Sequence, residues 1–311
     1  MVSRSTRVFL LGCLVFWAVG LYAVVPVESQ AESQKDEKIC IKPELRDCIL
    51  TNLGRYFTEF PSDIASIAVY PFKDGNYKPV MGAIGVTGAV SVFDKPLTQS
   101  LYNFQETTTD LGLTEKEFAK KWWYVPGFVL YDSAFTYALP LLHAYGAFSN
   151  NFHLYRASYL AIKTWSYSVV VAIPLRMFFK REYPIYDQNH ELNNSQYEFF
   201  SSSPTGTEYI KGFPLKSFPS FRAAMWFSAA DIFANEYDSY FLPYSAATVL
   251  TIIGKNTHWV SDIVFGFFTG MGVSRAILNK YAPGKKSSST EVSWMPYLSQ
   301  DFYSMNMLVS F

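Results

Sequence analysis

The sequence predicts an all-α protein, and three observations favour that class. From about Ser62 onward, long apolar stretches alternate with short polar breaks. Few regions show the strict apolar–polar alternation that is typical of strands. Half of the 311 residues are hydrophobic and 18% are aromatic, which is enough for one large core, or for one core with a small appendage. We therefore expect a helical bundle for the body of the chain.

The expected helices are apolar stretches that end at polar residues, glycine or proline. In chain order they are Val80–Phe93, Leu97–Gln105, Gly127–Phe148, Phe152–Phe179, Phe218–Asn235 and Pro243–Tyr281. The last is expected to break near Gly254-Lys255-Asn256. Residues 182–217 are rich in Asn, Ser, Gly and Pro and predict a long loop. Loops of that length in a compact domain are commonly lids or binding segments.

The N-terminus has the pattern of a secretory signal. Arg4 and Arg7 precede an apolar run of 18 residues, Val8–Val25, and Ser29-Gln30-Ala31 supplies small residues for cleavage. This favours a signal peptide over residues 1–31. An uncleaved anchor is the alternative, because the run is also long enough to span a bilayer. Either way we expect an exported protein of the periplasm or cell envelope.

The remaining divisions follow composition. Residues 32–61 form a polar N-terminal segment, 62–282 the helical domain, and 283–311 a linker with a short β-hairpin. After signal removal only Cys40 and Cys48 remain, and an even pair in an oxidising compartment suggests a disulfide. Two separate thiols are the alternative.

The net charge does not indicate a nucleic-acid partner, since Lys+Arg and Asp+Glu number 26 each. Charged residues interrupt three of the apolar helices. The cleaner stretches Thr164–Leu175 and Ser239–Gly254 are shorter than the roughly 20 residues that a span requires. These features favour a soluble or peripheral bundle over an inserted one, and leave association with a membrane surface open.

His258 and Asp262 are the strongest candidates for chemistry. In a helix, residues four apart share one face, so the carboxylate of Asp262 can orient the imidazole and leave its other nitrogen free to attack an electrophile. A purely structural pair is the alternative. His143 and His153 lie apart from any acidic cluster with metal-ligand spacing, so no metal site is predicted.

With its upstream residues, the pair resembles the type 2 phosphatidic acid phosphatase (PAP2) and vanadium haloperoxidase superfamily, over roughly residues 80–282. That family carries Lys-x6-Arg-Pro, then Pro-Ser-Gly-His, then Ser-Arg-x5-His-x3-Asp. Here the corresponding residues are Arg176 with Tyr183-Pro184, then Pro219-Ser220-Phe221-Arg222, then Thr251-Ile252 with His258 and Asp262. The order and spacing match, whereas several of the letters differ.

The resemblance implies a PAP2-like helical bundle that hydrolyses a phosphate ester through a phosphohistidine. His258 would be the nucleophile and Asp262 would orient it, while Arg176, Ser220 and Arg222 would hold the phosphoryl group. No cofactor is implied, and vanadate would act as an inhibitor or phosphate mimic. The implied partner is a phosphorylated small molecule or lipid, such as a lipid phosphate or an isoprenoid diphosphate.

The residues that differ from the family motifs predict weakened catalysis. Arg222 replaces the histidine that protonates the leaving oxygen, and arginine cannot release a proton at working pH. Tyr183 and Ile252 replace two cations, and losing one transition-state donor typically costs on the order of 10²–10³ in rate. Candidate replacements are Lys180, Arg181, Lys255 and, as an acid, His190. The alternative function is an inactive protein of this fold that binds anions or serves as a structural or interaction module.

Overall fold

The computed structural model describes only part of the chain. It covers residues 48–73, 75–109, 133–187, 189, 191–194, 197, 199–200, 217–253 and 258–281, together with the backbone of 291–299 and 302–310. For residues 106–109, 133–137 and 253, too, only the backbone is described. The predicted signal peptide, Cys40, His190 and Lys255 lie outside this part of the chain, so the predictions about them remain predictions.

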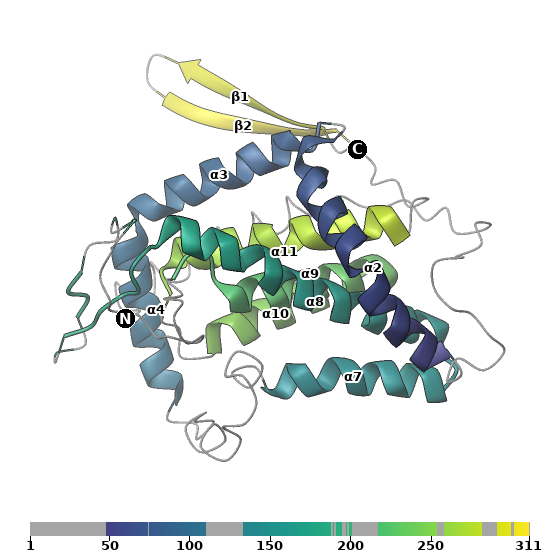
Figure 1. Cartoon of the computed structure of the whole chain (residues 1–311). Coiled ribbons are helices and arrows are strands. Elements are labelled where there is room, and N and C mark those ends of the chain that lie inside the picture. Colours follow the sequence, from purple (N-terminus) through teal and green to yellow (C-terminus); the bar gives the residue numbers. More distant parts are fainter. Residues whose placement is uncertain are drawn as a thin grey trace.

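Helices dominate the described residues, which confirms the predicted all-α class (Figure 1). In chain order the elements are α2 (Ile49–Val69), the 3-10 helix η2 (Tyr70–Phe72), α3 (Tyr77–Val92), α4 (Asp94–Thr109), α7 (Ser133–Phe148), α8 (Phe152–Phe179), α9 (Phe221–Glu236), α10 (Phe241–Ile253), α11 (Val260–Tyr281), β1 (Glu291–Ser299) and β2 (Phe302–Ser310). The two strands pair antiparallel, with Glu291 opposite Ser310.

Helix α9 lies at the centre, where it packs against α8, α10 and α11 (Figure 1). Buried residues occur all round this helix, as expected for a helix enclosed by others. It begins at Phe221, three residues later than predicted, because Ser220 has an extended backbone and acts as the N-cap. The Ser220 hydroxyl accepts a hydrogen bond from the amide of Ala223 at 3.4 Å.

Two glycines let α11 approach α9 closely. A Cβ atom on Gly266 would lie 2.6 Å from the carbonyl oxygen of Ser220, and one on Gly270 would collide with the backbone of Ala224. Both positions therefore require glycine for close packing of the two helices. A Cβ on Gly272 would meet nothing within 4 Å, so Gly272 has no such packing role.

Helix α8 has the predicted bounds and carries site residues at its C-terminal end. The side chain of Asn151 caps its start by accepting a hydrogen bond from the amide of Leu154 at 3.0 Å. Lys180 ends the helix in the left-handed conformation, with φ of 45°. Arg176 therefore lies in the last turn, and Arg181 directly follows the cap. The predicted break after α10 is also confirmed, since α10 ends at Ile253 and α11 begins at Val260.

Helix α2 crosses the boundary that the sequence suggested between residues 61 and 62. It continues through Pro61. Its buried Asp63 forms a salt bridge with Lys163 on α8, with 2.8 Å between Oδ2 and Nζ. This part of the predicted polar segment is thus a packed helix. Cys48, just before α2, is buried and disulfide-bonded. Its predicted partner, Cys40, lies outside the described residues.

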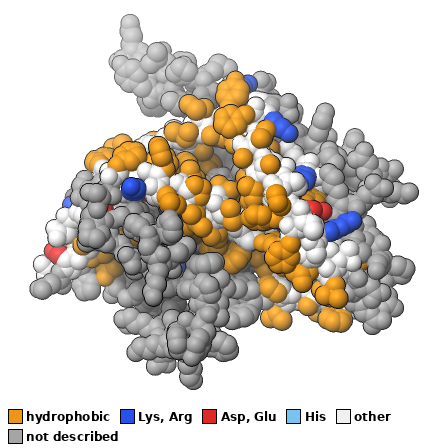
Figure 2. Space-filling model, in the orientation of Figure 1, with side chains coloured by type: hydrophobic (Ala, Val, Ile, Leu, Met, Phe, Trp, Pro, Cys, Tyr) orange, Lys and Arg blue, Asp and Glu red, His pale blue; other side chains and the backbone are white. Residues whose placement is uncertain are grey.

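Large apolar side chains remain on the surface of several helices (Figure 2). On α3 the small residues Ala83 and Thr87 are buried, whereas Met81 and Ile84 are 61% and 51% exposed. Among the described helices, α11 is long and apolar enough to cross a membrane, but 67% of its apolar window is buried in the bundle. Helices α3 and α4 pass the same test only as one span bent by 77°. Length and composition are therefore weak grounds for a span here.

Candidate functional site

The candidate site forms where the C-terminal end of α8 meets the starts of α9 and α11, three elements that pack together (Figure 1). His258 lies two residues before α11, so the expectation that it sits within the helix is wrong. It still reaches the predicted partner, because Nδ1 of His258 lies 3.8 Å from Oδ2 of Asp262. That distance is too long for a hydrogen bond.

The other ring nitrogen of His258 faces Arg176. Nη2 of Arg176 lies 3.4 Å from Nε2 of His258, and a guanidinium can only donate hydrogen bonds. We therefore assign the tautomer with its hydrogen on Nδ1, directed toward Asp262, and the lone pair on Nε2. This is the tautomer that a histidine nucleophile requires.

Electrostatics favour the neutral form of His258. Burial lowers the pKa of His258, and the charges of Arg176 and Arg222 lower it further, while Asp262 raises it. The net pKa lies below the ordinary value. For Asp262, burial alone would raise the pKa, but Arg181 and His258 hold it below its ordinary value. The pair is thus a neutral imidazole beside a carboxylate.

Arg176 is almost completely buried and is fixed from three sides. Its Nε donates to the carbonyl oxygen of Pro219 at 2.7 Å, and its Nη1 donates to the hydroxyl of Tyr183 at 3.2 Å. Its guanidinium carbon lies 3.6 Å from the ring centroid of Phe221. Tyr183, which stands where the family pattern has arginine, therefore supports Arg176 and supplies no charge of its own.

Ser220 and Arg222 approach the site in different ways. The amide of Ser220 donates to the backbone oxygen of Asp262 at 3.0 Å, while its hydroxyl serves as the α9 cap. Arg222 is partly buried, and its positive charge lowers the pKa of His258. The structure thus brings Arg176, His258 and Asp262 into direct contact and places Ser220 and Arg222 at their edge.

Arg181 is the residue that sequence reasoning most underrated. It was one of four candidate replacements, yet it is fully buried, and its Nη1 donates to Oδ1 of Asp262 at 2.5 Å. Its Nη2 donates to Asp94 at 2.7 Å. Asp94 was missed altogether, because nothing near it in sequence marks it as part of the site. Lys180, by contrast, is exposed, as an ordinary surface charge would be.

Ile252, the second position that lacks a family cation, has a packing role. It lies against the apolar cluster between α9, α10 and α11, and its carbonyl oxygen accepts a hydrogen bond from Gln105 at 2.7 Å. The neighbouring Thr251 is buried. An arginine at position 252 would have to bury its charge among these apolar side chains, so the substitution to isoleucine fits its surroundings.

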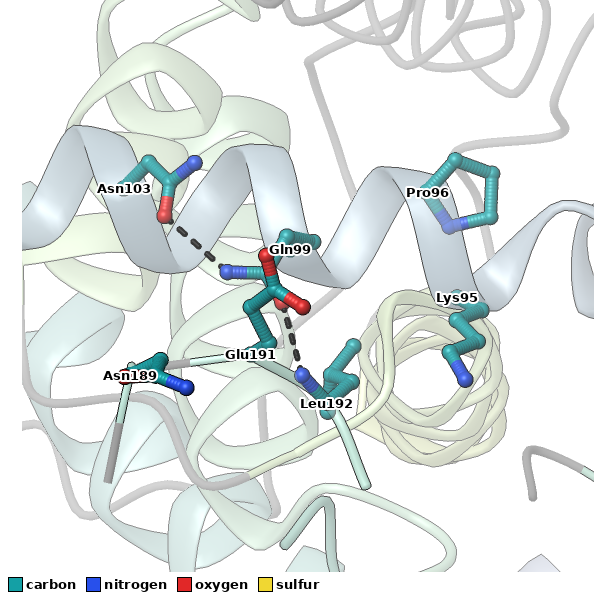
Figure 3. Close-up of a pocket in the computed structure, with 7 residues that line it drawn as sticks. All are labelled: Lys95, Pro96, Gln99, Asn103, Asn189, Glu191 and Leu192. Carbon is teal, nitrogen blue, oxygen red and sulfur yellow. Dashed lines mark hydrogen bonds between the residues drawn. The ribbon is translucent and has the colours of Figure 1, made fainter. Parts of the chain in front are cut away.

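A polar cavity of about 550 Å³ lies beside α4 (Figure 3). It is lined by Lys95, Pro96, Gln99, Asn103, Asn189, Glu191 and Leu192. Gln99 organises it by donating to the Asn103 side chain at 3.0 Å and accepting from the amide of Leu192 at 3.0 Å. None of the lining residues belongs to the His258 cluster.

Within the part of the chain that the structure describes, no group of three His, Cys, Asp or Glu side chains is arranged to hold a metal ion. In comparisons with known proteins, the chain matches no protein-family model, no curated protein and no solved structure. The site is therefore defined by its own geometry as a neutral histidine held between guanidinium groups and a buried carboxylate.

Proposed function

We propose that the protein is an exported PAP2-like phosphatase that hydrolyses phosphate esters through a phosphohistidine on His258. The observation that carries the proposal is the position of Nε2 of His258, 3.4 Å from Nη2 of Arg176. A phosphoryl group that bonds to this guanidinium would lie against the lone pair of the imidazole. Proximity of this kind, together with fixed positive charge, supplies most of the catalysis in phosphoryl transfer.

In the proposed first step, Nε2 of neutral His258 attacks phosphorus as the bond to the ester oxygen breaks. The imidazole then carries the phosphoryl group, and Asp262 stabilises the positive charge on the ring from 3.8 Å. Arg176 and Arg222 balance the charge on the phosphoryl oxygens. In the second step, water attacks phosphorus and loses a proton to solvent while the bond from phosphorus to Nε2 breaks, so that phosphate leaves and His258 returns to its neutral form.

The leaving group is expected to decide which substrates react. Arg222 stands at the place of the family's general acid and cannot donate a proton, so no general acid serves the leaving oxygen from that position. General acid catalysis is typically worth about 10²–10⁴ in rate. Substrates whose leaving oxygen is stable as an anion escape this loss. We therefore place diphosphates of the isoprenoid class ahead of simple lipid phosphate esters.

The rival function is a catalytically inactive protein of the same fold that binds anions or serves as an interaction module of the cell envelope. One observation favours it. Arg176 already donates to Pro219 and Tyr183, so part of its hydrogen-bonding capacity is committed to the protein. The apolar side chains exposed on α3 would suit either function, because both allow contact with a membrane surface.

Hydrolysis by purified protein tests the proposal. We expect release of phosphate from p-nitrophenyl phosphate and an isoprenoid diphosphate, slower release from phosphatidic acid, and inhibition by vanadate. The variant His258→Ala should lose this activity, and brief reaction with ³²P-labelled substrate should label wild type only. Equal rates for the wild type and the variant would refute catalysis. Vanadate binding without turnover would establish the rival function.

A further inference from the structure

The carboxylate of Asp262 is shared unequally between two bases. Oδ1 accepts a hydrogen bond from Arg181 at 2.5 Å, whereas Oδ2 lies 3.8 Å from Nδ1 of His258 and accepts from the amide of Trp259 at 3.2 Å. Asp262 is fully buried, so solvent does not screen this competition. Arg181 therefore holds the carboxylate more tightly than the histidine does.

Arg181 is itself held by a second carboxylate, which comes from the start of α4. Nη2 of Arg181 donates to Oδ2 of Asp94 at 2.7 Å, and Nη1 also donates to the hydroxyl of Ser261 at 2.6 Å. The amide of Ser261 donates to Oδ1 of Asp94 at 2.7 Å, and the Ser261 hydroxyl donates to Oδ2. Asp94, Arg181, Ser261 and Asp262 are all fully buried. We call these four residues the Asp94 brace.

The pKa values of the two carboxylates in the brace are shifted in opposite directions. Burial raises the pKa of Asp94, and the charge of Asp262 raises it further, although Arg181 opposes both. The pKa of Asp262 lies below its ordinary value, because Arg181 and His258 outweigh burial. Asp262 thus remains ionised more readily than Asp94.

We propose that Arg181 and Asp94 are positioning residues that set the ionisation of His258 in opposite directions: Arg181 favours the neutral ring by holding the Asp262 carboxylate away from the imidazole, and Asp94 opposes this by limiting how strongly Arg181 does so. Both residues act on His258 through Asp262, which Arg181 contacts directly and Asp94 reaches through Arg181. The consequence for catalysis rests on the proposed function, whereas the effect on the ionisation of His258 does not.

Other charged and titratable groups also face His258 and must be held constant. Among the described residues these are Arg176 on α8, Tyr183 in the segment after it, Arg222 on α9 and Asp262 itself. Both arginines favour the neutral imidazole and Asp262 opposes it. A change at Arg181 or Asp94 substitutes none of these four residues, so a shift in the titration of His258 reports on the brace.

The two variants are expected to act in opposite directions. In Arg181→Gln, Asp262 loses its nearer cation and turns to His258, so the pKa of His258 should rise by about one pH unit. In Asp94→Asn, Arg181 keeps only one carboxylate and binds Asp262 more tightly, so the pKa of His258 should fall, by less than one unit. General damage to the fold would move both variants the same way. The asparagine is also nearly isosteric, which protects its packing.

NMR titration of the imidazole rings in the full-length protein provides the test. The chain has 4 histidines, so the ring signals of His258 can be assigned with His258→Gln. The matched control is Lys163→Met, which removes another fully buried cation with two carboxylate partners, Glu59 and Asp63, in a cluster separate from the brace. It should leave the titration of His258 unchanged.

Opposite shifts in Arg181→Gln and Asp94→Asn, with none in the control, would support the brace. Shifts in the same direction, or no shift in Asp94→Asn, would overturn it, and Asp94→Asn decides alone if Arg181→Gln does not fold. If the protein is active, the acidic limb of its kcat/KM profile should follow the two shifts. An inactive protein with opposite shifts would retain the brace and lose only the proposed function.

Discussion

Nε2 of His258 and Nη2 of Arg176 lie 3.4 Å apart in a nearly closed part of the bundle, with only 14% of the His258 side chain exposed. A cation beside an imidazole is costly unless the ring is neutral or an anion joins them. The lowered pKa of His258 meets the first condition, and a bound phosphoryl group would meet the second. The proposed function relies on the second condition, in which a bound anion joins the two side chains.

Removal of the Arg176 charge should weaken anion binding more than any other single change at the site. We expect Arg176→Gln to reduce vanadate affinity by about tenfold or more, because a charge-assisted hydrogen bond typically contributes about 1.5–3 kcal/mol. Calorimetric titration with vanadate measures this directly. Lys180→Gln, which removes an exposed cation four residues along the chain, is the matched control and should leave the affinity unchanged.

The contrast between Lys180 and Arg181 shows where sequence reasoning stops. Both are basic residues beside the first motif, and pattern alone gave them equal standing. The left-handed cap at Lys180 turns the chain, so that Lys180 faces solvent and Arg181 enters the core. Asp94 lies 87 positions away from Arg181 along the chain. A single sequence records neither the turn nor a contact of that range, whereas local apolar runs were enough to place α8 and to predict the break after α10.

The close packing of α9 and α11 depends on Gly270. We expect Gly270→Ala to destabilise the fold by about 1–3 kcal/mol, because its Cβ would collide with the backbone of Ala224. Gly272→Ala, two residues along the same helix, should be neutral or stabilising by up to about 1 kcal/mol, since it meets nothing within 4 Å and alanine favours helix. Urea denaturation of the two variants measures the difference. Equal effects would show that the helices have room to separate.

Lys163 fixes α2 to the rest of the bundle. Its Nζ lies 2.8 Å from Glu59 and 2.8 Å from Asp63, and it also donates to the hydroxyl of Tyr281. We expect Lys163→Met to cost about 3–5 kcal/mol of unfolding free energy, because the buried Asp63 would lose its fully buried cationic partner. Lys280 also contacts Asp63 but is partly exposed, so Lys280→Met should cost less, on the order of 1 kcal/mol. A larger loss in Lys280→Met would contradict this ranking.

The same cluster predicts how stability depends on pH. Burial alone would raise the pKa of Asp63, but Lys163 and Lys280 hold it below its ordinary value. A depressed carboxyl pKa stabilises the fold above the unfolded-state pKa, and this contribution is lost as pH falls through the folded-state pKa. We therefore expect it to decline below about pH 4. Denaturation at pH 7 and pH 3 should show a smaller acid-induced loss in Lys163→Met than in wild type, and equal losses would exclude Asp63 as the titrating group.

Helix α3 presents its apolar side chains outward, and this arrangement predicts contact with lipid. Ala83 and Thr87 are buried, while Met81 and Ile84 face out at 61% and 51% exposure. Each such side chain gains about 1.5–3 kcal/mol when it is fully removed from water. The net charge is zero, so attraction to anionic lipid is not expected to contribute. We expect the protein to float with phosphatidylcholine vesicles, independently of salt, and the double variant Met81→Gln/Ile84→Gln to reduce bound protein by about tenfold. Thr58→Gln, an exposed change on α2, should bind as wild type does. If the double variant floats as well as wild type does, lipid contact does not involve this face of α3, and its exposed side chains would be assigned to contact with a protein partner instead.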